Sequence, residues 1–215
     1  MHIYFYICLL GFFFGFLPLS LFMTLKNKLS KDVFLIFPLL VLIFLGCVYE
    51  LVFTTILGVD ASVWFKVYTT LEFFVLIHYF YHLLKRKYKY LYLFFGIFYL
   101  VCFSLIAFQG KIPIFMDGDS YLQAIESIFV ITAILLWMQY AFIHLQQDSL
   151  LKYSHFYFIS GLLFYFSGTL FLYLLGSVIL QNEKEYFLDY WMLNIFFNIF
   201  LRILLLVGIW KARVQ

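Results

Sequence analysis

The stretch WMLNIFFNIFLRILLLVGIW, residues 191–210, decides the fold class. A helix of this length rises about 30 Å, which matches the hydrocarbon core of a bilayer, so the stretch predicts a transmembrane helix. Tryptophan stands at both ends of the stretch, as expected for a helix anchored at two membrane interfaces. Asn194, Asn198 and Arg202 recur at every fourth position and therefore share one helix face. We expect that face to point into a helix bundle.

Six further apolar runs of similar length precede this one and are separated by charged or turn-forming residues. The composition agrees, because 66% of the residues are hydrophobic, 12% are charged and the mean hydropathy is +1.02. Soluble domains are about half apolar and a quarter charged. We therefore predict an all-α, polytopic transmembrane helix bundle that forms a single integral membrane domain over residues 1–215. The seven predicted spans are residues 3–25, 33–53, 63–84, 90–108, 121–143, 156–180 and 191–210.

The distribution of Lys and Arg predicts the orientation, because cytoplasmic loops carry an excess of both residues. The loops on one side hold only Lys111 and Lys184. The loops on the other side and the C-terminal tail hold Lys26, Lys28, Lys31, Lys85, Arg86, Lys87, Lys89, Lys152, Lys211 and Arg213. We predict an N-terminus outside and a C-terminus in the cytoplasm, with the bacterial cytoplasmic (inner) membrane as the expected location. The placement of the net charge of +3 fits membrane orientation, so we expect the lipid bilayer as a partner and predict no binding of nucleic acid.

Five ionisable residues lie inside the predicted spans, namely Glu50, Lys66, Glu72, Glu126 and Arg202. A charge near the centre of a membrane helix costs about 2.5–3.5 kcal/mol on insertion scales, so such residues rarely face lipid and usually mark a function. Counting helical rise places Glu72 and Arg202 near the midplane and the other three nearer the outer surface. The opposite charges of Glu72 and Arg202 suggest that the two side chains meet.

Two interpretations of these charges remain open. The first is a cavity that opens to the outside and binds a small ligand or protons, with Arg202 engaging an anionic or carbonyl group. The second is a closed ion pair between Glu72 and Arg202 that fixes helix register and binds nothing. The residues predicted to line the cavity are Glu72, Arg202, Asn198, Asn194, Glu126, Glu50, Tyr68 and Lys66.

Glycines predict where helices approach each other closely. Gly11 and Gly15 form a GxxxG spacing, which indicates a contact face either within the bundle or between two copies of the chain in a homo-oligomer. Gly161 and Gly168 share one side of their predicted helix and indicate a second packing face.

His78 and His82 are the weak candidates for a metal site. Their i, i+4 spacing places both imidazoles on one helix face, which can chelate a metal ion. No third ligand can be assigned at the same depth, so we interpret the pair as interfacial histidines. We assign no metal, cofactor or catalytic residue to the chain.

The pattern favours a sensory or receptor-type membrane module that detects a signal at an outward-facing polar cavity and acts on a separate membrane or cytoplasmic signalling protein. The alternative is a proton-coupled transporter of a small solute or ion, which the midplane carboxylate beside an arginine also fits. An intramembrane lipid-acting enzyme has the least support, because no nucleophile and base can be placed together. A purely structural or assembly role is the remaining interpretation.

Overall fold

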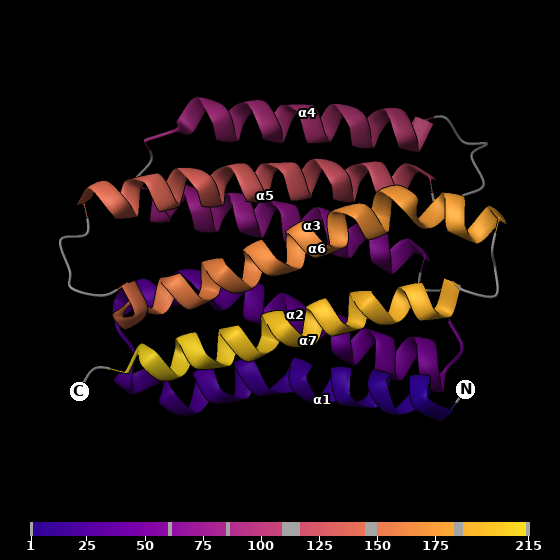
Figure 1. The fold of residues 1–215 in the computed structure, drawn as a ribbon, viewed down its shortest axis with the longest axis horizontal. Coiled ribbons are helices and arrows are strands. Elements are labelled where there is room, and N and C mark those ends of the chain that lie inside the picture. The colour runs from indigo at the N-terminus through magenta and orange to yellow at the C-terminus, as the bar shows by residue number, and fades with distance from the viewer. Residues whose placement is uncertain are drawn as a thin grey trace.

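A computed structural model describes residues 2–59, 62–84, 87–108, 117–144, 150–182 and 187–213. These residues form seven long α-helices and no β-strand, which confirms the all-helical prediction (Figure 1). The long helices lie close to the seven predicted segments, and the helices run side by side along one axis. They are α1 (His2–Leu25), α2 (Phe37–Tyr49), α3 (Ser62–Leu83), α4 (Lys89–Phe108), α5 (Asp117–His144), α6 (Ser154–Asn182) and α7 (Phe187–Lys211).

The helix around α2 departs from regular α geometry at both ends. The 3-10 helix η2 (Lys31–Ile36) leads into α2, and the π-helix η3 (Glu50–Ile56) continues it. Pro38 lies at the start of α2, where a missing backbone N–H breaks no helical hydrogen bond. The sequence did not predict the π-helix. Its position matters because π-turns are rare and often occur at functional sites, and Glu50 is its first residue.

Six of the helical segments are long and apolar enough to cross a membrane. They are Leu9–Lys28, Lys31–Thr54, Lys89–Ile106, Ser120–Ile143, Ser154–Leu175 and Met192–Lys211. The remaining long helix, α3, is less apolar because it carries Lys66, Glu72, His78 and His82. Its Phe73, however, lies fully buried in the bundle core. These properties are consistent with a multi-pass integral membrane protein.

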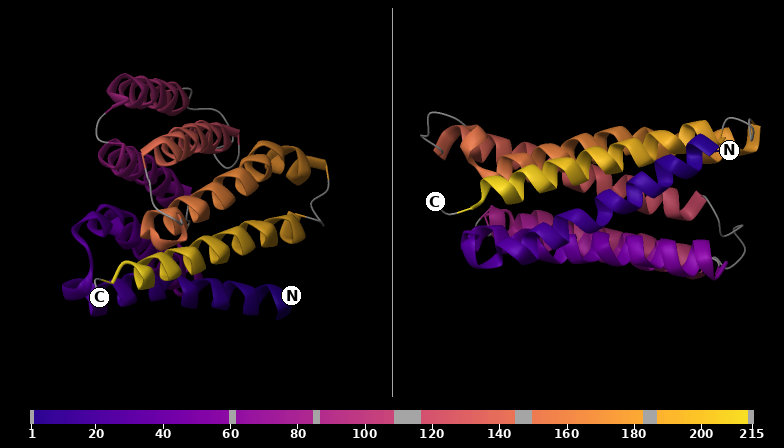
Figure 2. Two further views of the ribbon diagram at one scale, coloured as in Figure 1. Left: turned by 60° about the vertical axis from the view of Figure 1, so that its left-hand side comes forward. Right: turned by 90° about the horizontal axis from the view of Figure 1, so that it is seen from below.

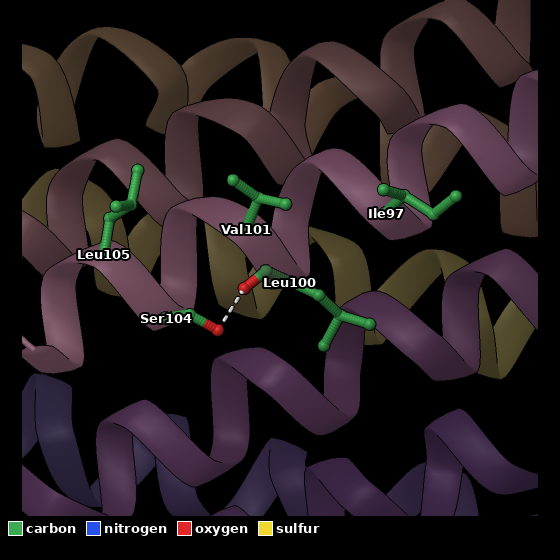
Figure 3. Close-up of a pocket in the computed structure, with 5 residues that line it drawn as sticks. All are labelled: Ile97, Leu100, Val101, Ser104 and Leu105. Atoms are coloured by element: carbon green, nitrogen blue, oxygen red, sulfur yellow. Dashed lines mark hydrogen bonds between the residues drawn. The ribbon is translucent and has the colours of Figure 1, made fainter.

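Six helices form a ring, and α4 lies outside it. Around the ring each helix contacts the next in the order α1, α2, α3, α5, α6, α7, and α7 packs back on α1. Among the described residues, helix α4 makes its main contacts with α3 and α5, and it lies at the edge of the molecule in Figure 1 and in the left view of Figure 2. Its outer face exposes many large apolar side chains. A shallow apolar pocket on this helix is lined by Ile97, Leu100, Val101, Ser104 and Leu105 (Figure 3).

The predicted packing glycines lie at close helix contacts within the chain. A Cβ atom on Gly15 would come within 2.1 Å of Cys47 Sγ on α2. A Cβ on Gly168 would come within 2.4 Å of the Phe197 ring on α7, and one on Gly161 within 3.1 Å of Leu201 on the same helix. The absence of side chains at these positions therefore sets how closely α1 packs on α2 and α6 on α7.

We call the two ends of the bundle the Glu50 end and the Asp32 end, after an acidic residue at each. The Glu50 end contains the start of α1, the π-helix η3 and the start of α7. The Asp32 end contains the loop between α1 and α2 and the end of α7. At the Asp32 end the Ser30 backbone N–H donates to Ala212 O at 3.4 Å, and the Arg213 guanidinium lies 3.2 Å from the centroid of the Trp210 ring. The hydrogen bond joins the C-terminal end of α7 to the first loop, whereas the Arg213–Trp210 contact lies within that end.

Candidate functional site

Polar side chains from three helices of the ring meet inside the bundle. We call Glu72 of α3, Glu126 of α5 and Asn194, Asn198 and Arg202 of α7 the polar cluster. Glu72 is 7% exposed and Glu126 is 1% exposed. Both carboxyl groups are therefore removed from the surroundings of the protein, and their energies depend on the groups that face them.

Arg202 of α7 reaches the neighbouring helix α1. Its Nη1 donates a hydrogen bond to the backbone carbonyl of Gly11, and its Nε is buried with no hydrogen-bond partner. The guanidinium interacts electrostatically with Glu72, yet in the described part of the chain no direct ion pair joins the two. The closed Glu72–Arg202 pair, one of the two interpretations of the sequence, is therefore not the arrangement in the structure.

Glu126 faces Glu72 across the interior. The two carboxyl groups interact electrostatically, and Oε1 of Glu126 is buried with no hydrogen-bond partner. Two buried carboxylates of like charge repel strongly when water does not screen them. The pair therefore favours binding a proton or a cationic group over holding two negative charges.

The asparagines form a link along α7. Nδ2 of Asn198 donates to the backbone oxygen of Asn194 at 3.2 Å and lies 3.3 Å from its side-chain oxygen. Tyr173 of α6 lies beside Asn194 and Tyr165 and interacts electrostatically with Glu72. Tyr68 of α3 faces the same interior, because it interacts electrostatically with Glu72 and Arg202.

Sequence reasoning missed the contribution of α6. Tyr165, Thr169 and Tyr173 recur at i, i+4 and i+8, which is the same spacing that revealed the polar face of α7. Tyr165 and Thr169 are buried. The periodic signal was present, but tyrosine and threonine are weaker markers of a polar face than asparagine and arginine.

Glu50 and Lys66 lie at the edge of the site. Glu50 is exposed at the start of η3 and interacts electrostatically with Arg202, whereas Lys66 is half-buried on the first turns of α3. Beside them Trp64 stacks on Tyr49 with ring centroids 4.5 Å apart, and it lies 6.2 Å from the ring of Tyr68. An aromatic group therefore stands between the Glu50 end and the polar cluster.

His78 and His82 lie away from the cluster, with ring centroids 4.6 Å apart. His78 is exposed and His82 is half-buried. The described residues contain no group of three or more His, Cys, Asp or Glu side chains that could hold a metal ion.

The polar cluster offers a ligand both a hydrogen-bond donor and a hydrogen-bond acceptor. Nε of Arg202 is a buried donor for an anionic or carbonyl group, and Oε1 of Glu126 is a buried acceptor for a proton or a cationic group. Buried polar atoms without partners are rare in proteins, and a bound ligand, ion or water is one explanation of them, strain or a catalytic role another. No family model, no curated protein and no solved structure matches the chain. The chemistry of the polar cluster is therefore the basis for assigning a function.

Proposed function

We propose that the chain is a seven-span receptor module with its N-terminus outside and its C-terminus in the cytoplasm. In this proposal α3 also crosses the membrane, which brings the number of spans to seven, and its polar residues face the bundle interior. The polar cluster binds a small ligand that enters from the Glu50 end. Binding changes how α3, α5 and α7 pack, and a separate signalling partner in the membrane or cytoplasm detects that change.

One observation carries the proposal: Arg202 is held by a backbone carbonyl of α1 and keeps a free buried donor, although an acidic residue lies nearby. A structural ion pair would use the guanidinium fully, because an unpaired donor in a buried site is unfavourable by about 1–3 kcal/mol. The arrangement supports a ligand with a carboxylate or carbonyl group, which would complete the hydrogen bonding of Arg202.

The orientation part of the proposal is supported by the loop charges and by the depth of the cluster. Counted from the Glu50 end, Glu126 lies in the third turn of α5 and Asn194 at the end of the second turn of α7. Glu72 lies at the middle of α3, and Arg202 lies past the middle of α7. Lys26, Lys28 and Lys211 lie at the opposite end. A ligand from outside would therefore reach Glu126 and Asn194 first.

The fluorescence of Trp64 tests ligand binding, because its ring lies close to Tyr68. We would replace Trp137, Trp191 and Trp210 by phenylalanine and place the protein in lipid nanodiscs. Sodium acetate is the probe, as the simplest carboxylate. We expect a saturable change in Trp64 emission that sodium chloride at equal ionic strength does not produce.

Two variants give the experiment its controls. Arg202→Gln should abolish the acetate response, because the amide has no charge and no planar fork. Arg213→Gln, made in the same background, should leave the response intact. Arg213 lies at the Asp32 end, beside position 210 and away from Trp64. A response that persists in Arg202→Gln, or that no concentration of acetate saturates, contradicts the proposal.

A proton-coupled transporter is the second candidate, and the facing carboxyl groups of Glu72 and Glu126 favour it. Such a pair can exchange a proton for a cationic group during each cycle. Proteoliposomes loaded with a pH-sensitive dye test this candidate. Proton flux that depends on both carboxyl groups and disappears in Glu72→Gln supports transport, whereas flux equal to that of empty liposomes rules it out.

A further inference from the structure

A short antiparallel bridge at the Asp32 end joins the loop between α1 and α2 to the end of α7. Leu29 pairs with Arg213, and the Ser30 N–H donates to Ala212 O at 3.4 Å. Leu29 and Ala212 are both 8% exposed, so the bridge is anchored in the bundle. Facing Cα atoms of an antiparallel pair lie about 4.5–5.5 Å apart, so the two segments are held side by side.

Four basic residues lie in these two segments. We call Lys28, Lys31, Lys211 and Arg213 the basic cluster. Lys28 and Lys31 flank the paired residues of the loop, and Lys211 and Arg213 flank Ala212 on α7. The three lysines are exposed to the surroundings of the protein. The bridge therefore gathers four positive charges from two segments that are far apart in the chain.

The basic cluster has little negative charge to balance it. In the described part of these two segments Asp32 is the acidic residue, and no ion pair joins it to a member of the cluster. The spacing of the two segments is shorter than the Debye length of about 8 Å at physiological salt, so the positive charges repel one another. A bound anion would relieve this repulsion.

An apolar stripe on α7 begins beside the basic cluster. Phe196, Ile203 and Trp210 recur at every seventh position and therefore share one face of α7. They are 55%, 38% and 53% exposed, so this face points away from the bundle. An exposed tryptophan next to basic residues is typical of the level of the lipid headgroups in a membrane. The surface therefore combines a cationic end with an apolar track, which matches an amphipathic anion.

Arg213 is held in place before any anion binds. Its guanidinium lies 3.2 Å from the centroid of the Trp210 ring, and its Nε donates to Trp210 O at 3.0 Å. Arginine binds phosphate through a planar fork of N–H groups, and a fork that is fixed in advance loses less side-chain entropy on binding.

We propose that the basic cluster binds the phosphate headgroup of an anionic phospholipid. The Arg213 guanidinium and the lysine ammonium groups surround the phosphate, and an acyl chain lies along the stripe that begins at Trp210. Each Lys or Arg near the surface strengthens the attraction to anionic lipid by about fivefold. A headgroup held by both segments also links the first loop to α7 and stabilises their bridge.

This inference goes beyond the proposed function and does not depend on it. It requires only that the Asp32 end lies at a membrane interface, on whichever side that end faces. The acetate response of the polar cluster neither supports nor contradicts it.

Quenching of Trp210 fluorescence by brominated lipid tests the inference. Trp64, Trp137 and Trp191 are replaced by phenylalanine, and the protein is reconstituted in bilayers of phosphatidylcholine and phosphatidylglycerol. Either one lipid or the other carries bromine in its acyl chains, because bromine quenches a tryptophan that it contacts. We expect phosphatidylglycerol to occupy the Trp210 site about tenfold more often than its share of the bilayer predicts. Raising the salt concentration should reduce this preference.

Matched double variants separate the basic cluster from the general positive charge of this end. Lys31→Gln with Lys211→Gln should remove most of the preference. Lys87→Gln with Lys89→Gln removes the same charge at the start of α4, on the far side of the bundle, and should leave the preference unchanged (Figure 1). Lys31→Arg with Lys211→Arg keeps the charge and should keep the preference, which controls for damage to the fold.

Three results would overturn the inference. The first is equal quenching by the two brominated lipids, which would leave an acidic protein segment as the alternative anion. The second is an equal loss of preference in the Lys87 and Lys89 double variant, because diffuse charge would then attract the lipid. The third is a loss of preference in the arginine double variant, since the charge of the cluster would then not be the cause.

Discussion

The contact between Gly15 and Cys47 gives the sharpest prediction about stability. In Gly15→Ala the new Cβ would lie 2.1 Å from Cys47 Sγ, 3.2 Å from Cys47 Cβ and 3.3 Å from Arg202 Nη1. Ordinary carbon contacts lie at about 3.5–4.0 Å. Either the sulfur must therefore move by roughly 1 Å or more, or α1 and α2 must separate. Rotating the thiol away does not relieve the other two contacts.

The magnitude follows from two opposing terms. Overpacking a buried contact destabilises proteins by about 1–3 kcal/mol. Replacing glycine by alanine inside a helix returns up to about 1 kcal/mol. We therefore expect Gly15→Ala to lower the free energy of unfolding by about 1–2 kcal/mol, which corresponds to a roughly 5- to 30-fold change in the unfolding equilibrium.

Reversible unfolding in mixed micelles, followed by circular dichroism, measures this loss. Gly96→Ala is the matched control, because its Cβ would meet only Ile77 Cδ1 at 3.9 Å and gains the same helical preference. We expect it to be neutral or stabilising. Cys47→Ala removes the sulfur that the new Cβ would meet. In a Cys47→Ala background, Gly15→Ala should therefore cost at most half of what it costs in the native chain. If Gly15→Ala is as stable as Gly96→Ala, the close approach of α1 to α2 is refuted.

Two further substitutions test other contacts by the same unfolding measurement. Gly168→Ala should destabilise by about 1–2 kcal/mol after the same subtraction, because its Cβ would meet the Phe197 ring at 2.4 Å. An unchanged stability contradicts the packing of α6 on α7. Tyr92→Phe removes a buried hydrogen bond of 3.1 Å to Phe80 O and should lower stability by about 0.5–1.5 kcal/mol. A Tyr92→Phe protein of full stability shows that this bond contributes nothing.

Long apolar runs made the helices predictable from the sequence, because a bilayer imposes a minimum helix length and requires every backbone polar group to be satisfied within the helix. The inward faces of α3 and α7 were also predictable in part. Each carries polar residues at helical spacing, as Asn194, Asn198 and Arg202 show. Helical rise also predicts a depth in the membrane for each of these residues.

The contacts between helices were not predictable, since they depend on which faces meet. Opposite charges suggested that Arg202 meets Glu72, but its Nη1 is hydrogen-bonded to the Gly11 backbone, which carries no sequence signal. His155 lies at the boundary of a predicted span, and no polar residue follows it within that span at i+3, i+4 or i+7. Its Nδ1 is nevertheless hydrogen-bonded to Tyr79 Oη at 3.0 Å, across the bundle and 76 positions away in the chain.

Access to the polar cluster from outside is the central claim, and thiol labelling tests it most directly. Asn198→Cys is made in a chain whose native cysteines are replaced by alanine, and the intact membrane is treated with a membrane-impermeant methanethiosulfonate reagent. We expect Asn198→Cys to react from the outer side. Val101→Cys, on the exposed apolar face of α4, should not react. Labelling of Asn198→Cys only from the cytoplasmic side, or from neither side, contradicts an outward-facing site.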